Sequence, residues 1–146
     1  MTQKEKVLLL KVLSAMLPYG VLCDYVYHIG HPQKLLSISL NEKYQIHLDS
    51  DEYVFGSGKS YGPSETTVDD IKPYLRPMSS MTEEEKMEVE KLGVCHDGAF
   101  HNDIYDIGIS MEEAFTAISW FLERHFDINY LIEKGLALEA PEDMYK

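Results

Sequence analysis

Residues 71–92 read IKPYLRPMSSMTEEEKMEVEKL and mark the point where an extended strand turns into a helix. Pro73 removes one backbone donor and favours an extended conformation at the residue before it. A strand that contains a proline is expected at the edge of a sheet, so we predict an edge strand over 71–76. Thr82 then begins a helix, because a threonine followed three residues later by Glu85 is the pattern of a capping box. The stretch therefore predicts a sheet with an exposed edge, joined directly to a helix.

Three segments upstream alternate apolar and polar residues, as half-buried antiparallel strands do. They span 21–28, 35–40 and 44–48, and the links between them are short enough for hairpins. Residues 53–55 can extend the sheet, whereas the rest of 49–70 is polar, rich in glycine and serine, and predicted to be a loop. We therefore predict a small antiparallel sheet of three to four strands.

Helices are predicted before and after this sheet. Thr2 can cap an apolar N-terminal helix. Ser110 and Glu113 form another capping box at the start of a later helix. The apolar residues of that helix are spaced to share one face, namely Met111, Ala114, Phe115, Ile118, Phe121 and Leu122. A last short helix is predicted over 129–134. Segregated strands and helices indicate an α+β fold, a single domain over 1–146 with an N-terminal helix and two to three C-terminal helices.

Composition restricts the classes of partner. The 146 residues carry a formal net charge of -12, which repels nucleic acid and anionic membranes and favours a basic protein partner or simple solubility. Cys23 and Cys95 make no disulfide framework, so we predict a cytoplasmic protein with free thiols. The apolar run at 7–17 is too short to span a bilayer and is interrupted by Lys11, so neither a membrane segment nor a signal peptide is predicted.

The GSGKS run at 56–60 resembles the end of a phosphate-binding loop. The full pattern requires a glycine where Tyr53 stands and a helix that begins after the lysine. Gly62 and Pro63 follow instead, so the helix dipole that would hold the phosphate is missing. We therefore predict a flexible loop here, with no nucleotide and no other cofactor.

Cys95, His96 and His101 lie within one loop and are the candidate metal ligands of the chain. Zinc prefers tetrahedral sulfur and nitrogen ligands, and the cysteine and histidines of 23–31 could complete a set of four. No C-x-x-C or H-x-x-x-H pair is present, however, so we predict no metal. No serine lies in a G-x-S-x-G elbow, and no catalytic residue is predicted.

Three residues are candidates for contact with a partner: Tyr74 and Arg76 on the predicted edge strand, and Trp120 on the helix that follows Ser110. An open strand edge can accept a strand from another chain. Trp120 lies off the main apolar face of its helix. We expect it to pack under the C-terminal tail, and if it is exposed it becomes the best interface candidate.

Three segments resemble a family of short proteins encoded in prophages and mobile elements of gut bacteria. They are LPYG at 17–20, KPYLRPMSSMTEEE at 72–85 and HFDINYLIEKGLALEAPEDMYK at 125–146. Because these segments are spread over almost the whole chain, the resemblance is to a complete protein. The family has no known activity, so the resemblance implies a genomic setting and no catalytic residues.

We therefore predict a small acidic protein that acts as a non-catalytic interaction module for an unknown protein partner. Two alternatives remain. One is an enzyme of unrecognised type that uses the loop 95–106, which a pocket of perturbed groups would favour and a smooth surface would weaken. The other is a homo-oligomeric structural protein, which would use an apolar patch or the strand edge for a two-fold contact.

Overall fold

The structure is a computed structural model that describes residues 1–26, 30–39, 45–49, 53–55, 58–60, 64–93, 95–96, 99–100 and 110–145. The helices are α1 (Gln3–Met16), α2 (Glu83–Lys91) and α4 (Met111–Glu123), with short 3-10 turns η1 (Leu17–Tyr19), η2 (Val68–Asp70) and η3 (Met78–Ser80). The strands are β1 (Leu22–Tyr25), β2 (Gln33–Ser39), β3 (Gln45–Leu48), β4 (Tyr53–Phe55), β5 (Gly58–Ser60), β6 (Ser64–Thr67), β7 (Ile71–Leu75), β8 (Cys95–His96), β9 (Ala99–Phe100) and β10 (Leu138–Glu139).

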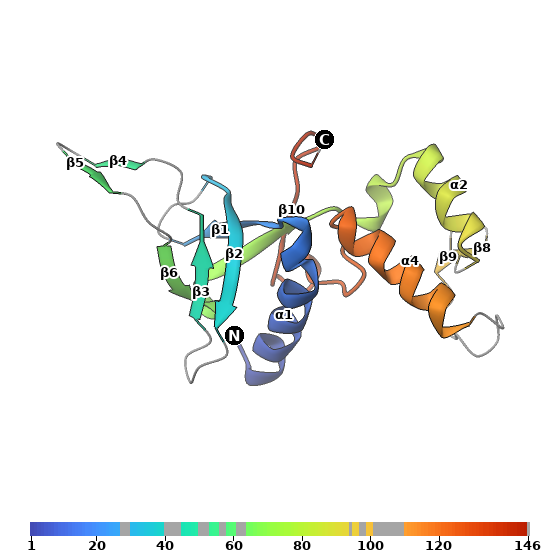
Figure 1. Ribbon diagram of the computed structural model, residues 1–146, viewed down its shortest axis with the longest axis horizontal. Coiled ribbons are helices and arrows are strands. Elements are labelled where there is room, and N and C mark those ends of the chain that lie inside the picture. The colour runs from blue at the N-terminus through green and yellow to red at the C-terminus, as the bar shows by residue number, and fades with distance from the viewer. Residues whose placement is uncertain are drawn as a thin grey trace.

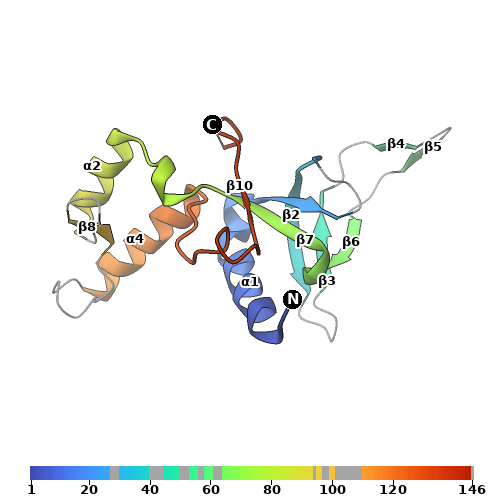
Figure 2. The same cartoon turned by 180° about the vertical axis from the view of Figure 1, so that it is seen from behind.

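The elements form two groups that lie side by side (Figure 1). In the first, α1 lies across one face of the main sheet, and the β4–β5 hairpin projects from that sheet as an arm. In the second, α2 and α4 pack together beside the short β8–β9 hairpin. The segment after β7 and the segment after α4 connect the two groups, and the view from behind shows both passing between them (Figure 2).

Within the described residues, the main sheet has six strands in the order β10-β7-β1-β2-β3-β6. Neighbouring strands are antiparallel except β10 and β7, which run parallel. The core forms between the sheet and α1, and its largest buried side chains include Leu9, Leu13, Met16, Leu35, Ile46, Leu48, Ile71 and Leu75. The α+β class and the N-terminal helix are thus confirmed, but the sheet is larger than predicted and is mixed rather than antiparallel.

The prediction that the proline-containing strand lies at the sheet edge is wrong, because β7 lies between β1 and β10. Pro73 is buried and stands opposite Cys23 in the ladder with β1. The Val26 N–H donates to the Asp70 carbonyl at 3.0 Å, and the alternation of an antiparallel ladder makes Cys23 and Pro73 a pair without mutual hydrogen bonds. β10 begins its pairing one residue after the proline, so neither neighbour requires the missing N–H.

Part of the region predicted as a loop, Ser64–Thr67, forms β6 at one edge of the sheet and pairs with β3. Its threonines are β-branched and suit a strand, although the segment is too polar to show an apolar alternation. β4 does not extend the sheet as expected, since it pairs only with β5 in the described residues. Lys59 of the GSGKS run lies in β5 and not at the start of a helix.

α1, α2 and α4 begin at the predicted N-terminal caps, and Thr82 and Ser110 form the predicted capping boxes. Thr2, Thr82 and Ser110 each accept a hydrogen bond from the backbone N–H three residues on, and the glutamate there accepts one in return. The prediction of a last short helix over 129–134 is wrong, because turns form there instead. Tyr130 has a left-handed φ of 56°, which a right-handed helix does not tolerate. No helix in the described part of the chain is long and apolar enough to cross a membrane.

Candidate interaction surface and adjoining pocket

Arg76, the residue that follows β7, links the two groups of elements. Its guanidinium donates two hydrogen bonds to the Glu85 carboxylate at 2.7 and 2.8 Å, and its carbon lies 4.2 Å from the centre of the Phe126 ring. Its main chain pairs with the turn after α4, since the N–H donates to the His125 carbonyl at 2.8 Å and the carbonyl accepts from the Asp127 N–H at 2.9 Å. Arg76 thereby fastens the sheet to both α2 and α4.

Glu85 serves two partners at once. One of its carboxylate oxygens accepts from the Thr82 N–H at 2.9 Å and completes the cap of α2, while the carboxylate also holds Arg76. The hydrogen bond from Arg76 is the main cause that lowers the pKa of Glu85, and the Thr82 N–H lowers it further. The Arg76 side chain is therefore satisfied within the chain, although the sequence suggested it as a contact for a partner.

The other two predicted contact residues are also engaged internally. The Trp120 indole donates to Glu88 of α2 at 3.1 Å and stacks on the Phe126 ring, so it lies between α2 and α4 rather than under the C-terminal tail. Tyr74 lies in the interior strand β7, and burial raises its pKa, with a further contribution from Asp24. An open strand edge, the reason for proposing Tyr74 as a contact, is absent at β7 in the described structure.

His125 and Tyr145 fasten the C-terminal tail to the sheet. Their rings are stacked, with centres 3.8 Å apart and planes 6° from parallel. The Tyr145 hydroxyl donates to the Tyr74 carbonyl at 2.8 Å and accepts from the Leu22 N–H at 3.0 Å. The His125 Nε2 lies 3.0 Å from the Tyr19 carbonyl, which can only accept, so Nε2 carries the proton. Nδ1 is then an acceptor, and it is buried without a hydrogen-bond partner.

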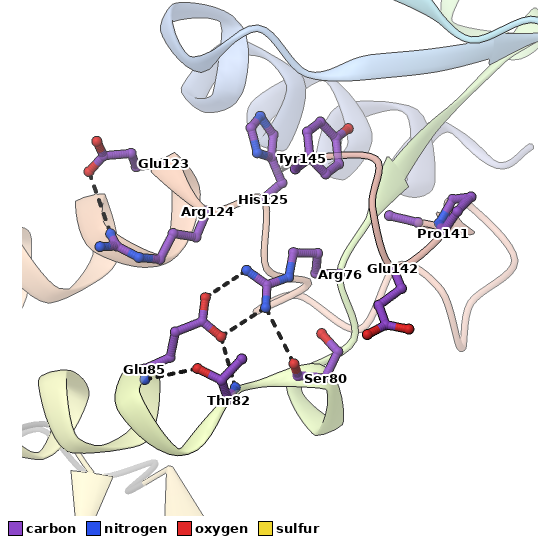
Figure 3. A pocket seen from close by; sticks show the side chains of 11 residues that line it. Arg76, Ser80, Thr82, Glu85, Glu123, Arg124, His125, Pro141, Glu142 and Tyr145 are labelled. Carbon is purple, nitrogen blue, oxygen red and sulfur yellow. Dashed lines mark hydrogen bonds and ion pairs between the residues drawn. The ribbon is translucent and has the colours of Figure 1, made fainter.

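These groups line a pocket of about 490 Å³ where the segment after β7, the start of α2, the end of α4 and the tail meet (Figure 3). The Arg76 side chain, from the segment after β7, points toward Glu85 at the start of α2, and the His125 and Tyr145 rings stand together at one side. The charged residues of the wall are Arg76, Glu85, Glu123, Arg124 and Glu142. No local pattern in the sequence indicates this pocket, because its residues come from positions far apart in the chain.

Acidification is expected to destabilise the protein through His125. Burial is the main cause that lowers its pKa below the ordinary value of 6.5, and the charge of Arg76 acts in the same direction. Between this lowered pKa and about 6.5, the unfolded chain binds more protons than the folded chain. The contribution of neutral His125 to the free energy of unfolding is therefore complete above about pH 6.5 and is lost as the pH falls through that window.

Urea denaturation at about pH 7.5 and about pH 5.5 measures this effect, since the two values lie on either side of the ordinary histidine pKa. The His125→Gln variant should show a flatter pH dependence than the wild type. His47→Gln is the control, because His47 lies in β3 away from the tail and should leave the dependence unchanged. A wild-type stability that rises on acidification over this window would contradict the assignment.

α4 exposes a stripe of large apolar side chains. Met111, Phe115 and Ile118 are 84%, 73% and 42% exposed, and their spacing places them on one side of the helix. Leu122 continues the stripe and is partly buried against the core between α1 and the sheet. We call Met111, Phe115 and Ile118 the α4 stripe.

The buried side of α4 is a different one, formed by Ala114, Ala117 and Phe121. The expectation that the apolar residues of this helix share one face is therefore partly wrong, because some of them are exposed and others are buried. Ala117, which is not among the residues of that expected face, is buried. The helix is apolar around much of its circumference, so periodicity alone does not determine which side is covered.

Negative charge is concentrated on the two helices of this part of the chain. α2 has five glutamates and two lysines, and α4 has three glutamates and neither lysine nor arginine. α1, in contrast, has three lysines and one glutamate. The α4 stripe is therefore set in acidic surroundings, with Glu112 and Glu113 exposed beside Met111.

The candidate metal ligands are only partly described. Cys95 and His96 form β8, but their side chains and the whole of His101 lie outside the described residues. The described residues contain no group of three or more histidine, cysteine, aspartate or glutamate side chains able to hold a metal ion. Cys23 lies in the core, where burial raises the pKa of its thiol to about 12. Most of the loop 95–106 of the enzyme alternative is likewise outside the described residues.

The fold and the surface define an α+β protein with a helix that presents an apolar stripe to solvent. Comparison of the chain with protein-family models, with curated proteins and with solved structures finds no match. The resemblance to proteins of prophages and mobile elements therefore stays a prediction.

Proposed function

We propose that this chain is a non-catalytic protein-interaction module and that the α4 stripe forms the centre of its contact surface. The observation that supports this proposal is the exposure of Met111, Phe115 and Ile118 on one side of a single helix. Scattered exposed apolar residues are ordinary, but a contiguous group of large ones marks a binding surface. Methionine and phenylalanine are also enriched at protein interfaces.

A basic protein is the partner that the charges favour. Glu112 and Glu113 adjoin the stripe, and α2 and α4 together carry eight glutamates and two lysines, so this part of the chain has negative potential that speeds the approach of a positively charged surface and disfavours an acidic one. The resemblance to prophage proteins adds a setting, in which the partner is a host or phage protein of the cytoplasm.

A homo-oligomer is the second candidate, because the same stripe on a second copy would cover it. A pocket with perturbed pKa values would favour the enzyme alternative. The pocket beside Arg76 contains such groups, but its lining residues come from outside the loop 95–106. In that pocket the Tyr145 hydroxyl is engaged by two backbone groups and Glu85 is engaged by Arg76, so neither is poised to react. This engagement favours the interaction module over the enzyme.

Photocrosslinking from the stripe tests the proposal. The residue p-benzoylphenylalanine, introduced in place of Phe115, should capture a distinct protein in host cells, whereas the same residue in place of Tyr130 should not. Tyr130 is the matched control because it is an exposed aromatic residue away from α4. The M111S/F115S/I118S variant should lose this partner, and V7S/L36S/Y130S, which removes as many exposed apolar side chains elsewhere, should keep it.

Light scattering on the purified protein separates the two candidates. A monomer that captures a distinct protein supports the proposal. A dimer that M111S/F115S/I118S converts to a monomer supports the homo-oligomer instead. If the protein is a monomer and crosslinking from position 115 captures the same proteins as crosslinking from position 130, both candidate functions are contradicted.

A further inference from the structure

We infer that the α4 stripe binds an amphipathic helix of the partner, which has an apolar seam and carries lysine or arginine on the side that faces Glu112. The inference rests on the proposed function and names the chemistry of its partner. It depends on the spacing and the width of the stripe, on the sides of α4 that are already covered, and on the exposed glutamate beside the stripe.

The stripe has the spacing of a coiled-coil seam. Met111, Phe115 and Ile118 follow one another at intervals of four and three residues, and the partly buried Leu122 comes four residues later. Apolar residues at these alternating intervals occupy the a and d positions of a heptad, where they insert as knobs into the holes of a second helix. The seam from 111 to 122 is about 16 Å long, or about three helical turns.

The stripe is also narrow. At about 100° for each residue, the side chains of the seam cover an arc of about 60° around the axis of α4. A helix that packs against a broad apolar surface has an apolar arc of about 100° or more, whereas a narrow a/d stripe is typical of contact with one other helix. A strand is not suited to this surface, because a helix has no open backbone edge with which a strand could pair.

The sides of α4 away from the stripe are largely covered. α2 packs on one of them, through the Trp120 hydrogen bond to Glu88 and the apolar cluster around Val89 (Figure 1). At the C-terminal end of the seam, Leu122 packs against the core between α1 and the sheet. The surface left open on α4 is therefore the stripe and the polar row beside it, which a single helix can contact.

The polar row beside the stripe determines the charge that the partner needs. Its residues are Glu112, Thr116, Ser119 and Glu123. The Glu112 carboxylate is exposed and forms no ion pair within the described residues, whereas the Glu123 carboxylate lies 3.7 Å from Nη1 of Arg124. With the seam at a and d, Glu112 occupies an e position, where the charge of the facing helix selects the partner. Lysine or arginine on that helix would pair with Glu112, and an acidic residue would be repelled.

A second copy of the chain fits the stripe less well than a basic helix does. α2 and α4 together carry eight glutamates and two lysines, so two copies joined at their stripes would bring like charges together. Like charges that face each other across an interface disfavour association. The charges therefore favour a helix of another protein over self-association.

Two synthetic helices test the inference on the full-length protein. The basic peptide has three heptads with leucine at a and d, lysine at e and g, and glutamine or alanine elsewhere, and the acidic peptide has glutamate in place of lysine. The basic peptide should bind with a Kd of roughly tens of micromolar, because three turns of seam bury a small area. The acidic peptide should bind at least about tenfold more weakly. Fluorescence anisotropy of the labelled peptides measures both affinities.

A third peptide controls for simple attraction of a cation to an acidic protein. It has the composition of the basic peptide, but its leucines are placed out of heptad order, and it should show no saturable binding. The basic peptide should also shift the NMR signals of the α4 amides. Equal binding of the basic and the reordered peptide overturns the inference, and so does equal binding of the basic and the acidic peptide.

The E112Q variant tests the side on which the partner is basic. It should weaken binding of the basic peptide about two- to fivefold, the range for one exposed ion pair. E84Q is the matched control, because Glu84 is also exposed and is likewise the second residue of a helix that begins with a capping box. It should change the affinity less than about 1.5-fold, since distant surface charges are screened by salt. Equal effects of the two substitutions overturn the role of Glu112.

The triple variants separate this inference from the proposed function. M111S/F115S/I118S should lose saturable binding of the basic peptide, and V7S/L36S/Y130S should keep it. If crosslinking from position 115 captures a distinct protein but the basic peptide binds neither variant nor wild type, the helix is overturned and the interaction module stands. If the basic peptide binds the stripe and crosslinking captures no distinct protein, the proposed function fails while the preference of the stripe for a basic helix is supported.

Discussion

Replacing Phe126 by alanine is expected to lower the free energy of unfolding by about 3–5 kcal/mol, the range for removal of a fully buried phenylalanine. Phe126 is completely buried. Its ring stacks on Trp120 within 8° of parallel and meets Phe121 edge-on, each at 5.9 Å between centres. The Arg76 guanidinium covers its face. The substitution thus removes contacts from α4 and from the link to the sheet at the same time.

Urea denaturation followed by Trp120 fluorescence measures this loss. The Phe126→Leu variant keeps an apolar side chain and should lose less, about 1–2 kcal/mol, because it forfeits the aromatic and cation contacts but leaves a smaller cavity. Phe115→Ala is the matched control, since Phe115 is an exposed phenylalanine on α4, and its effect should stay within about 0.5 kcal/mol. Equal losses at Phe126 and Phe115 would show that Phe126 is not in a core.

The features that the sequence predicted well are those fixed by neighbouring residues. A capping box is complete within four residues, so Thr2, Thr82 and Ser110 all mark real helix starts. The position of Pro73 depends on a partner far away in the chain, because β10 has only two residues and gives no strand signal of its own. Local pattern could not show that such a short segment would cover β7.

In the candidate site too, features set by neighbouring residues were predictable from the sequence, whereas contacts between distant residues were not. Arg76 was singled out from the sequence, but for an edge strand that does not exist, and its partner Glu85 was recognised only as a cap. His125 and Tyr145 gave no signal, since a single histidine and a single tyrosine acquire meaning only when the tail brings their rings together. The α4 stripe had a signal in the sequence, because the helix has more apolar residues than one buried face requires.

The Asp127→Ala variant is expected to lose about 2–6 kcal/mol, because two N–H groups lose their acceptor and each such loss costs about 1–3 kcal/mol. Asp127 is buried, and its two carboxylate oxygens accept from the N–H groups of Leu131 and Ile132, both at 2.8 Å. The carboxylate thereby shapes the turns that replace the predicted last helix. These turns lead directly to β10, so the loss should also loosen the tail that carries Tyr145.

The Asp127→Asn variant separates the hydrogen bonds from the space that the side chain fills. An amide keeps one acceptor oxygen at the same size, so about half of the loss should remain. Glu133→Ala, which removes an exposed carboxylate from the same turns, is the control and should stay within about 0.5 kcal/mol. Hydrogen exchange at the Leu131 and Ile132 amides supplies the local readout. If both amides stay protected in Asp127→Ala, the carboxylate does not hold the turns, and the tail owes its position to the pairing of β10 with β7 and to the Tyr145 contacts.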